Sequence, residues 1–211
     1  PRGEIRNDSF KWKHKGIRFF GTTYDDRFGR YLDATHMPRS NQSPCKQLGE
    51  YMKISIFGLG YVGAVTAGCL AKDGNHVIGI DSDEKKVTLI TEGRSPIIED
   101  EIQEIIADTV STGNLIATMD VDYAVCNSSI SMICVGTPSQ QNGSIDLKYV
   151  RRVCEQIGES IRTKKEFHVV VMRSTMLPGS MKEVVIPTLE QASGKSAGKD
   201  FGICNNPEFL R

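Results

Sequence analysis

The sequence predicts an α/β domain built on a doubly wound parallel sheet, and two features from residue 52 onward carry this prediction. Short β-branched apolar runs alternate with longer segments of helical period, which is the order expected of βαβ units. The runs are apolar throughout rather than alternating, as is typical of parallel strands covered by helices on both faces. The predicted strands are residues 53–57, 76–80, 115–118, 130–135, 168–172 and 201–204.

The predicted helices connect these strands. They cover residues 61–72, 83–92, 100–110, 147–162 and 179–191. The 211-residue chain is long enough for one such domain with a substantial core. We therefore expect one folded unit over residues 52–211.

Residues 1–51 differ from the rest of the chain in composition and hydrophobic pattern. Apolar residues are sparse there and follow no period, and Gly, Pro, Ser, Asn and charged residues are scattered throughout. We predict an irregular or disordered extension, either native or foreign to the natural protein, with Met52 as the natural initiator. A short hairpin around residues 17–24 is the alternative.

Composition excludes several classes of function. With 39% apolar and 25% charged residues and a net charge of zero, the chain has the balance of a soluble globular protein and no basic face for nucleic acid. No apolar run approaches the roughly 18 residues of a membrane span, and we see no signal peptide. The six cysteines form no CxxC pair and the four histidines no triad or zinc spacing, so we expect reduced thiols, a cytoplasmic location and no metal site.

The strongest chemical signal follows the first predicted strand. The sequence there reads Gly58-Leu59-Gly60-Tyr61-Val62-Gly63, and a G-x-G-x-x-G pattern between a strand and a helix is typical of a dinucleotide-binding Rossmann fold. Gly58 permits the tight turn, Gly60 lets the backbone approach a pyrophosphate, and Gly63 lets the helix pack closely. The backbone N–H groups of Tyr61 and Val62 are the expected phosphate donors.

An acidic residue ends the second predicted strand. Asp81 lies 18 residues beyond Gly63, close to the roughly 20 expected for the carboxylate that binds the adenosine ribose. Because this carboxylate would repel a 2′-phosphate, the sequence predicts NAD rather than NADP. Lys85 and Lys86 could pair with a 2′-phosphate, pair with the cofactor diphosphate or face water. A turn of this kind that binds FAD, S-adenosylmethionine or no ligand is the structural alternative.

Three further polar clusters follow later predicted strands, at the edge where open α/β sheets bind ligands. Thr137 would direct a hydroxyl into the cofactor crevice, or belongs to an ordinary turn. Ser174 and Thr175 follow the next strand, and a hydroxyl there could equally cap the following helix. Glu208 is either an active-site carboxylate or a solvated charge.

Four segments of the chain form a recognisable set. They are Phe57-Gly58-Leu59-Gly60-Tyr61-Val62-Gly63, Val135-Gly136-Thr137-Pro138, Arg173-Ser174-Thr175 with Pro178-Gly179, and Asn206-Pro207-Glu208-Phe209-Leu210. Together they resemble the UDP-glucose/GDP-mannose dehydrogenase family over about 160 residues. The resemblance implies NAD-dependent oxidation of a nucleotide sugar at C6, from GDP-mannose to the alginate precursor GDP-mannuronate, with UDP-glucose as the alternative substrate.

The resemblance also implies roles for matching positions. The residues expected to contact NAD are Tyr61, Val62, Asp81, Lys86, Thr137 and Thr175. Thr175 and Glu208 would also face the reacting carbon and hold or activate water, and general-base action by a carboxylate makes the role of Glu208 physically sensible.

The family's nucleophilic cysteine has no counterpart here. In the family it follows Gly-Gly-Ser, attacks the aldehyde intermediate and forms a thioester, and none of the six cysteines in this chain has that context. The family's second Rossmann domain and its central dimer-forming helix have no counterpart either. We therefore expect a chain that does not complete the oxidation alone and is monomeric, although the family forms homo-oligomers. A non-catalytic NAD-binding module and another dehydrogenase sharing the Rossmann half are the competing hypotheses.

Overall fold

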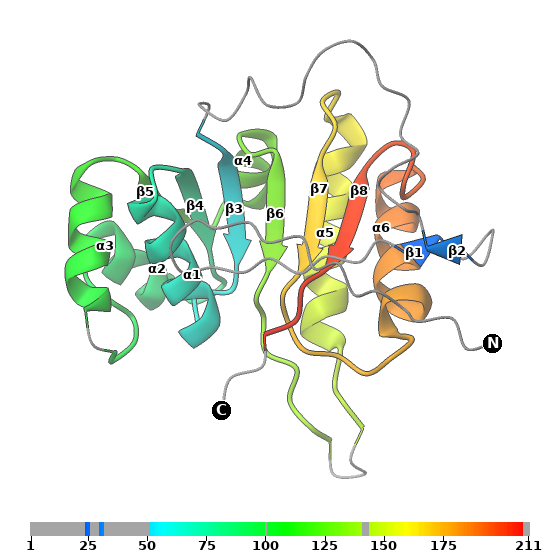
Figure 1. The fold of residues 1–211 in the computed structure, drawn as a ribbon, viewed down its shortest axis with the longest axis horizontal. Coiled ribbons are helices and arrows are strands. Elements are labelled where there is room, and N and C mark those ends of the chain that lie inside the picture. Colours follow the sequence, from blue (N-terminus) through cyan, green and yellow to red (C-terminus); the bar gives the residue numbers. More distant parts are fainter. Residues whose placement is uncertain (1–23, 26–29, 32–50, 100, 141–143, 209–211) are drawn as a thin grey trace, which may run out of the picture.

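A six-stranded sheet forms the centre of the molecule in the computed structural model, which describes residues 24–25, 30–31, 51–99, 101–140 and 144–208. All neighbouring strands run parallel, in the order β5-β4-β3-β6-β7-β8 (Figure 1). The strands are β3 (Lys53–Phe57), β4 (His76–Ile80), β5 (Leu115–Thr118), β6 (Ile130–Ile133), β7 (Val169–Met172) and β8 (Gly202–Asn205). The predicted doubly wound parallel sheet is confirmed.

The order of the strands places a topological switch between β3 and β6. The chain builds outward from β3 through β4 to β5, then returns to β6 on the other side of β3 and continues to β7 and β8. Strands β3 and β6 pair in register from Ile54↔Ile130 to Phe57↔Ile133. In open α/β sheets the ligand crevice forms outside the carboxyl ends of the strands at such a switch.

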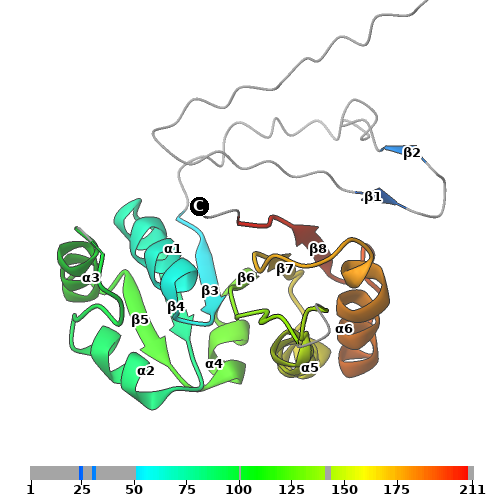
Figure 2. The same cartoon turned by 90° about the horizontal axis from the view of Figure 1, so that it is seen from below.

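Helices cover both faces of the sheet and create two cores (Figure 2). One core holds Ile54 and Ile56 of β3, and the other holds Phe57, because successive strand residues point to opposite faces. The helices of the first core are α1 (Tyr61–Lys72), α2 (Glu84–Thr91) and α3 (Ile102–Ser111). Those of the second are α4 (Val121–Cys126), α5 (Lys148–Thr163) and α6 (Ile186–Ser193).

Two helical details differ from the prediction. The helix predicted over residues 179–191 is a π-helical turn (Met181–Val185) followed by α6. Pro187 lies in the first turn of α6 and has no N–H to donate to the preceding turn, which explains why the regular pattern is interrupted there. Helix α4 was not predicted, since its six residues are too few to show a helical period. It is capped by Asp120, which accepts a hydrogen bond from the backbone N–H of Tyr123.

Most of the predicted extension lies outside the described residues, as do Cys45, His14 and His36. Within it the structure gives only β1 (Tyr24–Asp25) and β2 (Arg30–Tyr31), which pair antiparallel, so the irregular character of residues 1–51 stays a prediction. In the described ranges the five cysteines are free. None of the described helices combines the length and apolarity that a bilayer crossing requires.

Candidate cofactor and active site

The three glycines of the turn after β3 have three different structural roles. Gly58 adopts a φ of 96°, in the left-handed region, and its N–H donates to Ile80 O at 2.7 Å. A Cβ on Gly63 would lie 1.7 Å from the carbonyl oxygen of Gly58, so α1 packs directly against the turn. A Cβ on Gly60 would meet no atom within 4 Å. The space beside Gly60 is therefore open, as a pyrophosphate lying against the backbone requires.

The N-terminus of α1 presents backbone donors to this space that bind none of the described residues. Its first hydrogen bond runs from Ala64 N to Gly60 O at 2.8 Å, so the N–H groups of Tyr61 and Val62 precede the helical ladder. Donors in this position favour an anion. The Tyr61 hydroxyl donates to Glu99 Oε2 at 2.7 Å, and this bond is the main reason why the pKa of Tyr61 is raised.

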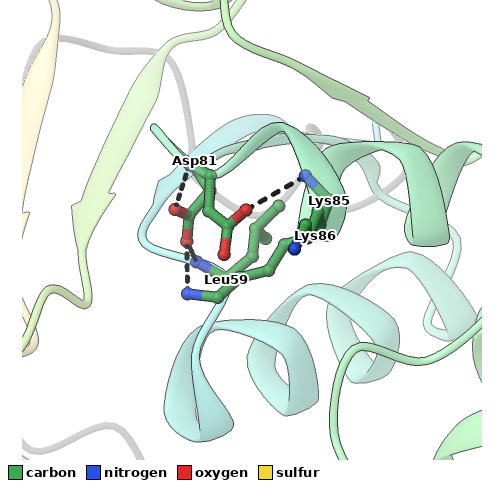
Figure 3. Close-up of polar contacts among 5 residues, drawn as sticks. Leu59, Asp81, Lys85 and Lys86 are labelled. Atoms are coloured by element: carbon green, nitrogen blue, oxygen red, sulfur yellow. Dashed lines mark hydrogen bonds and ion pairs between the residues drawn. The ribbon is translucent and has the colours of Figure 1, made fainter.

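Asp81 follows β4 and reaches back to the glycine turn (Figure 3). Its Oδ2 accepts hydrogen bonds from Leu59 N at 2.7 Å and from Lys86 Nζ at 3.1 Å, and its Oδ1 accepts from Asp83 N at 2.9 Å. Lys86 is thus ion-paired with Asp81 rather than directed only toward water. The carboxylate that is expected to bind the ribose also fixes the turn, a role that the sequence did not reveal.

We expect Asp81→Ala to weaken NAD binding by about 10-fold to 100-fold, because hydrogen bonds to a charged group contribute about 1.5–3 kcal/mol. The preference for NAD over NADP should narrow, since the repulsion of a 2′-phosphate is removed. Titration calorimetry on the 211-residue chain checks both. Asp83→Ala is the matched control, because Asp83 caps α2 through Lys85 N, and it should keep the preference. Equal NAD affinity in wild type and Asp81→Ala would contradict the ribose role.

A pocket of about 330 Å³ extends from the glycine turn along the carboxyl ends of the strands. Asp81 and Lys86 line it on one side, and Val135 and Gly136 line it after β6. The far wall comes from α5 and was missed by the sequence analysis. It consists of Tyr149, Arg152, Val153 and Gln156. Their spacing marks one helical face, but the same spacing also describes a face buried in a core.

The predicted residues after β6, β7 and β8 meet in one chain of hydrogen bonds. The Thr137 hydroxyl donates to Thr175 O at 2.9 Å, and the Thr175 hydroxyl donates to Glu208 O at 2.6 Å. The Ser174 hydroxyl points the other way and donates to Val135 O. The helical segment that follows has Ser180 at its N-cap and no side-chain capping bond, so neither hydroxyl caps it.

The Glu208 side chain is not a solvated charge. It is 27% exposed, and its Oε2 forms an ion pair with Nη2 of Arg173, whose Nη1 donates to Asn206 Oδ1. Both charges act on the Cys134 thiol, where burial, the largest effect, raises the pKa to about 12, while Arg173 lowers it and Glu208 raises it. A thiol with this pKa stays protonated near neutral pH, where the thiolate is the reactive form.

Known proteins are similar to this chain over residues 52–211. The NAD binding domain of the UDP-glucose/GDP-mannose dehydrogenase family matches residues 52–211. A GDP-mannose 6-dehydrogenase from Azotobacter vinelandii is 54% identical over 160 residues, and a UDP-glucose 6-dehydrogenase from Haloferax volcanii is 37% identical over 160. The crystal structure of a ternary complex of GDP-mannose dehydrogenase from Pseudomonas aeruginosa superposes with a TM-score of 0.75 at 54% identity.

These alignments cover a part of each protein. They include 76% of this chain but 37% of the Azotobacter and Haloferax relatives and of the Pseudomonas structure. The chain thus spans little more than a third of the length of the relatives it matches.

Proposed function

The chain belongs to the UDP-glucose/GDP-mannose dehydrogenase family, and from that premise we propose that it serves the NAD-dependent oxidation of GDP-mannose at C6 to GDP-mannuronate. The identity of 54% to a GDP-mannose 6-dehydrogenase, against 37% to a UDP-glucose 6-dehydrogenase, supports this choice of sugar nucleotide. The matched domain is an NAD-binding domain, so the cofactor is NAD.

The observation that carries the proposal is the fit of the crevice to a dinucleotide. The open space at Gly60 and the N–H groups of Tyr61 and Val62 suit the pyrophosphate, and Asp81 suits the ribose hydroxyls. Lys86 lies beside Asp81 and would balance its charge near the phosphates. When bound, NAD supplies the hydride acceptor.

We assign the reacting end of the site to the residues after β7 and β8. Thr137 and Thr175 would contact the cofactor there, and Thr175 and Glu208 would face the sugar carbon. The bond from the Thr175 hydroxyl to Glu208 O keeps the two residues side by side. Glu208 Oε1 has no partner among the described residues, so this oxygen is available to hold and deprotonate a water.

We propose a role in supplying alginate precursor, which rests on the resemblance to the family, and a cytoplasmic location, which the free described thiols support. We also propose that residues 52–211 are one part of the active unit, and that homo-oligomers form through segments other than this domain.

The test is to express the entire reading frame that contains residues 52–211 and to assay it with GDP-mannose and UDP-glucose. We expect two NADH per GDP-mannose and little turnover of UDP-glucose. The 211-residue chain assayed alongside should bind NAD without forming GDP-mannuronate. Preference for UDP-glucose would overturn the choice of sugar. NAD binding without turnover of either sugar would favour the non-catalytic module.

A further inference from the structure

The backbone places Arg173 next to Asn206 and Glu208, at the end of the site that we assign to the sugar carbon. Strands β7 and β8 pair with Met172 opposite Asn205, so the next residues, Arg173 and Asn206, lie opposite each other. The pairing continues beyond the strands, with Asn206 N donating to Met172 O and Glu208 N to Arg173 O. These two bonds bring Asn206 and Glu208 next to Arg173.

The guanidinium of Arg173 binds both neighbours at once. Nη1 donates to the amide oxygen of Asn206, and Nη2 pairs with Oε2 of Glu208. The pair is largely shielded, with the Arg173 side chain 19% exposed and that of Glu208 27% exposed. A planar guanidinium can hold two acceptors in fixed directions, whereas an ammonium acts as a point charge.

One donor of Arg173 has no partner. Its Nε is buried and makes no hydrogen bond among the described residues. Buried polar groups are rarely left unpaired, so this donor calls for an explanation. The guanidinium itself is held by Asn206 through Nη1 and by Glu208 through Nη2.

We propose that Arg173 is a positioning residue for the oxidation, which holds Oε2 of Glu208 so that Oε1 is the oxygen that accepts a proton from water. This inference rests on the proposed function, because Glu208 has its role only within that reaction. Arg173 acts through Glu208 and does not touch the reacting atoms. Its substitution should therefore lower kcat and leave the KM for NAD unchanged.

The first experiment is a double-mutant cycle on the stability of the 211-residue chain. Arg173→Met and Glu208→Gln should each lower the urea midpoint, and the double variant should lower it by less than the sum of the two shifts. Arg151→Met, an exposed arginine on α5, is the matched control and should leave the midpoint in place. Additive shifts of Arg173→Met and Glu208→Gln would show that the two side chains are not paired and would overturn the proposal.

The second experiment uses a hybrid in which residues 52–211 replace the 160 aligned residues of a GDP-mannose 6-dehydrogenase. Glu208→Gln should lower kcat by about 10²-fold to 10⁴-fold, the range of general-base catalysis, and Arg173→Met by no more than that. The double variant should lose no more than the larger single loss. Arg173→Lys should recover part of the loss, because it keeps one charge contact.

The outcomes separate this inference from the proposed function. If the losses in kcat multiply in the double variant, Arg173 does not act through Glu208 and the positioning role is wrong. A change confined to the KM for NAD would overturn it as well. An unsubstituted hybrid that binds NAD but turns over no sugar would count against the proposed function, whereas the stability cycle decides the pairing of Arg173 by itself.

Discussion

Replacement of Gly63 by alanine is expected to destabilise the domain by about 3 kcal/mol, at the upper end of the usual cost of overpacking. The added Cβ would lie 1.7 Å from Gly58 O and 2.9 Å from Gly58 C, and these atoms belong to the backbone of the turn. Neither can move aside as a flexible side chain could. Either α1 is displaced or the turn opens, so NAD binding should be lost as well. Urea denaturation of the 211-residue chain measures the loss of stability.

The matched control is Gly60→Ala, three residues away on the same turn. Gly60 has a φ of −76°, which alanine adopts freely, and an added Cβ meets no atom of the chain within 4 Å. We expect stability within about 0.5 kcal/mol of wild type, as for other substitutions that disturb no packed contact, but weaker NAD binding because the methyl group occupies the space beside the turn. Equal stability of Gly63→Ala and Gly60→Ala would contradict the packing role of Gly63. Unchanged NAD binding by Gly60→Ala would contradict the approach of the pyrophosphate.

Much of the fold could be predicted because its strands are mostly apolar and its connections are long. The bounds of β3, β4, β5 and α1 match the prediction residue for residue, since a change of period marks both of their ends. Strand β6 ends at Ile133, two residues early, because the apolar residues Cys134 and Val135 continue the pattern into the loop that lines the pocket. Apolar character alone does not distinguish a strand from an apolar loop that lines a pocket.

The site was predicted as a set of positions but not as a set of contacts. The spacing from the glycine turn to Asp81 is local information, and in the structure the turn and Asp81 line the same pocket. That Asp81 binds Leu59 N depends on β3 and β4 lying side by side, and that Arg173 binds Glu208 depends on the register of β7 and β8. Such contacts join residues 22 and 35 positions apart, and no periodicity within one segment reveals them.

A chain of buried hydrogen bonds joins Lys164 and His168 to the end of α4 and to β6. Lys164 Nζ donates to Val125 O at 2.6 Å, to Ser128 O and to His168 Nδ1 at 3.0 Å. Because an ammonium group only donates, His168 Nδ1 must accept and its proton resides on Nε2, which donates to Ser131 Oγ at 2.8 Å. The arrangement therefore requires a neutral imidazole.

His168 is expected to make the protein lose stability in mild acid. Burial, and secondly the Lys164 ammonium, lower its pKa from 6.5 to about 4. Between these two values the unfolded chain binds a proton that the folded chain does not, so the free energy of unfolding falls as the pH falls. The contribution is complete above pH 6.5 and is lost by about pH 4. The pKa gap of about 2.5 corresponds to about 3 kcal/mol.

The measurement is urea denaturation of the 211-residue chain at pH 7, 5.5 and 4, compared with His168→Gln. The variant should be less stable at pH 7, because glutamine cannot satisfy both Lys164 and Ser131 in the same way. It should then lose about 3 kcal/mol less than wild type between pH 7 and pH 4, since the acid sensitivity of carboxylates is common to both. His76→Gln, which removes an exposed imidazole at the start of β4, is the matched control and should keep the wild-type slope. Parallel losses in wild type and His168→Gln would show that His168 takes up its proton at the same pH in the folded and unfolded chains, and would contradict the buried neutral imidazole.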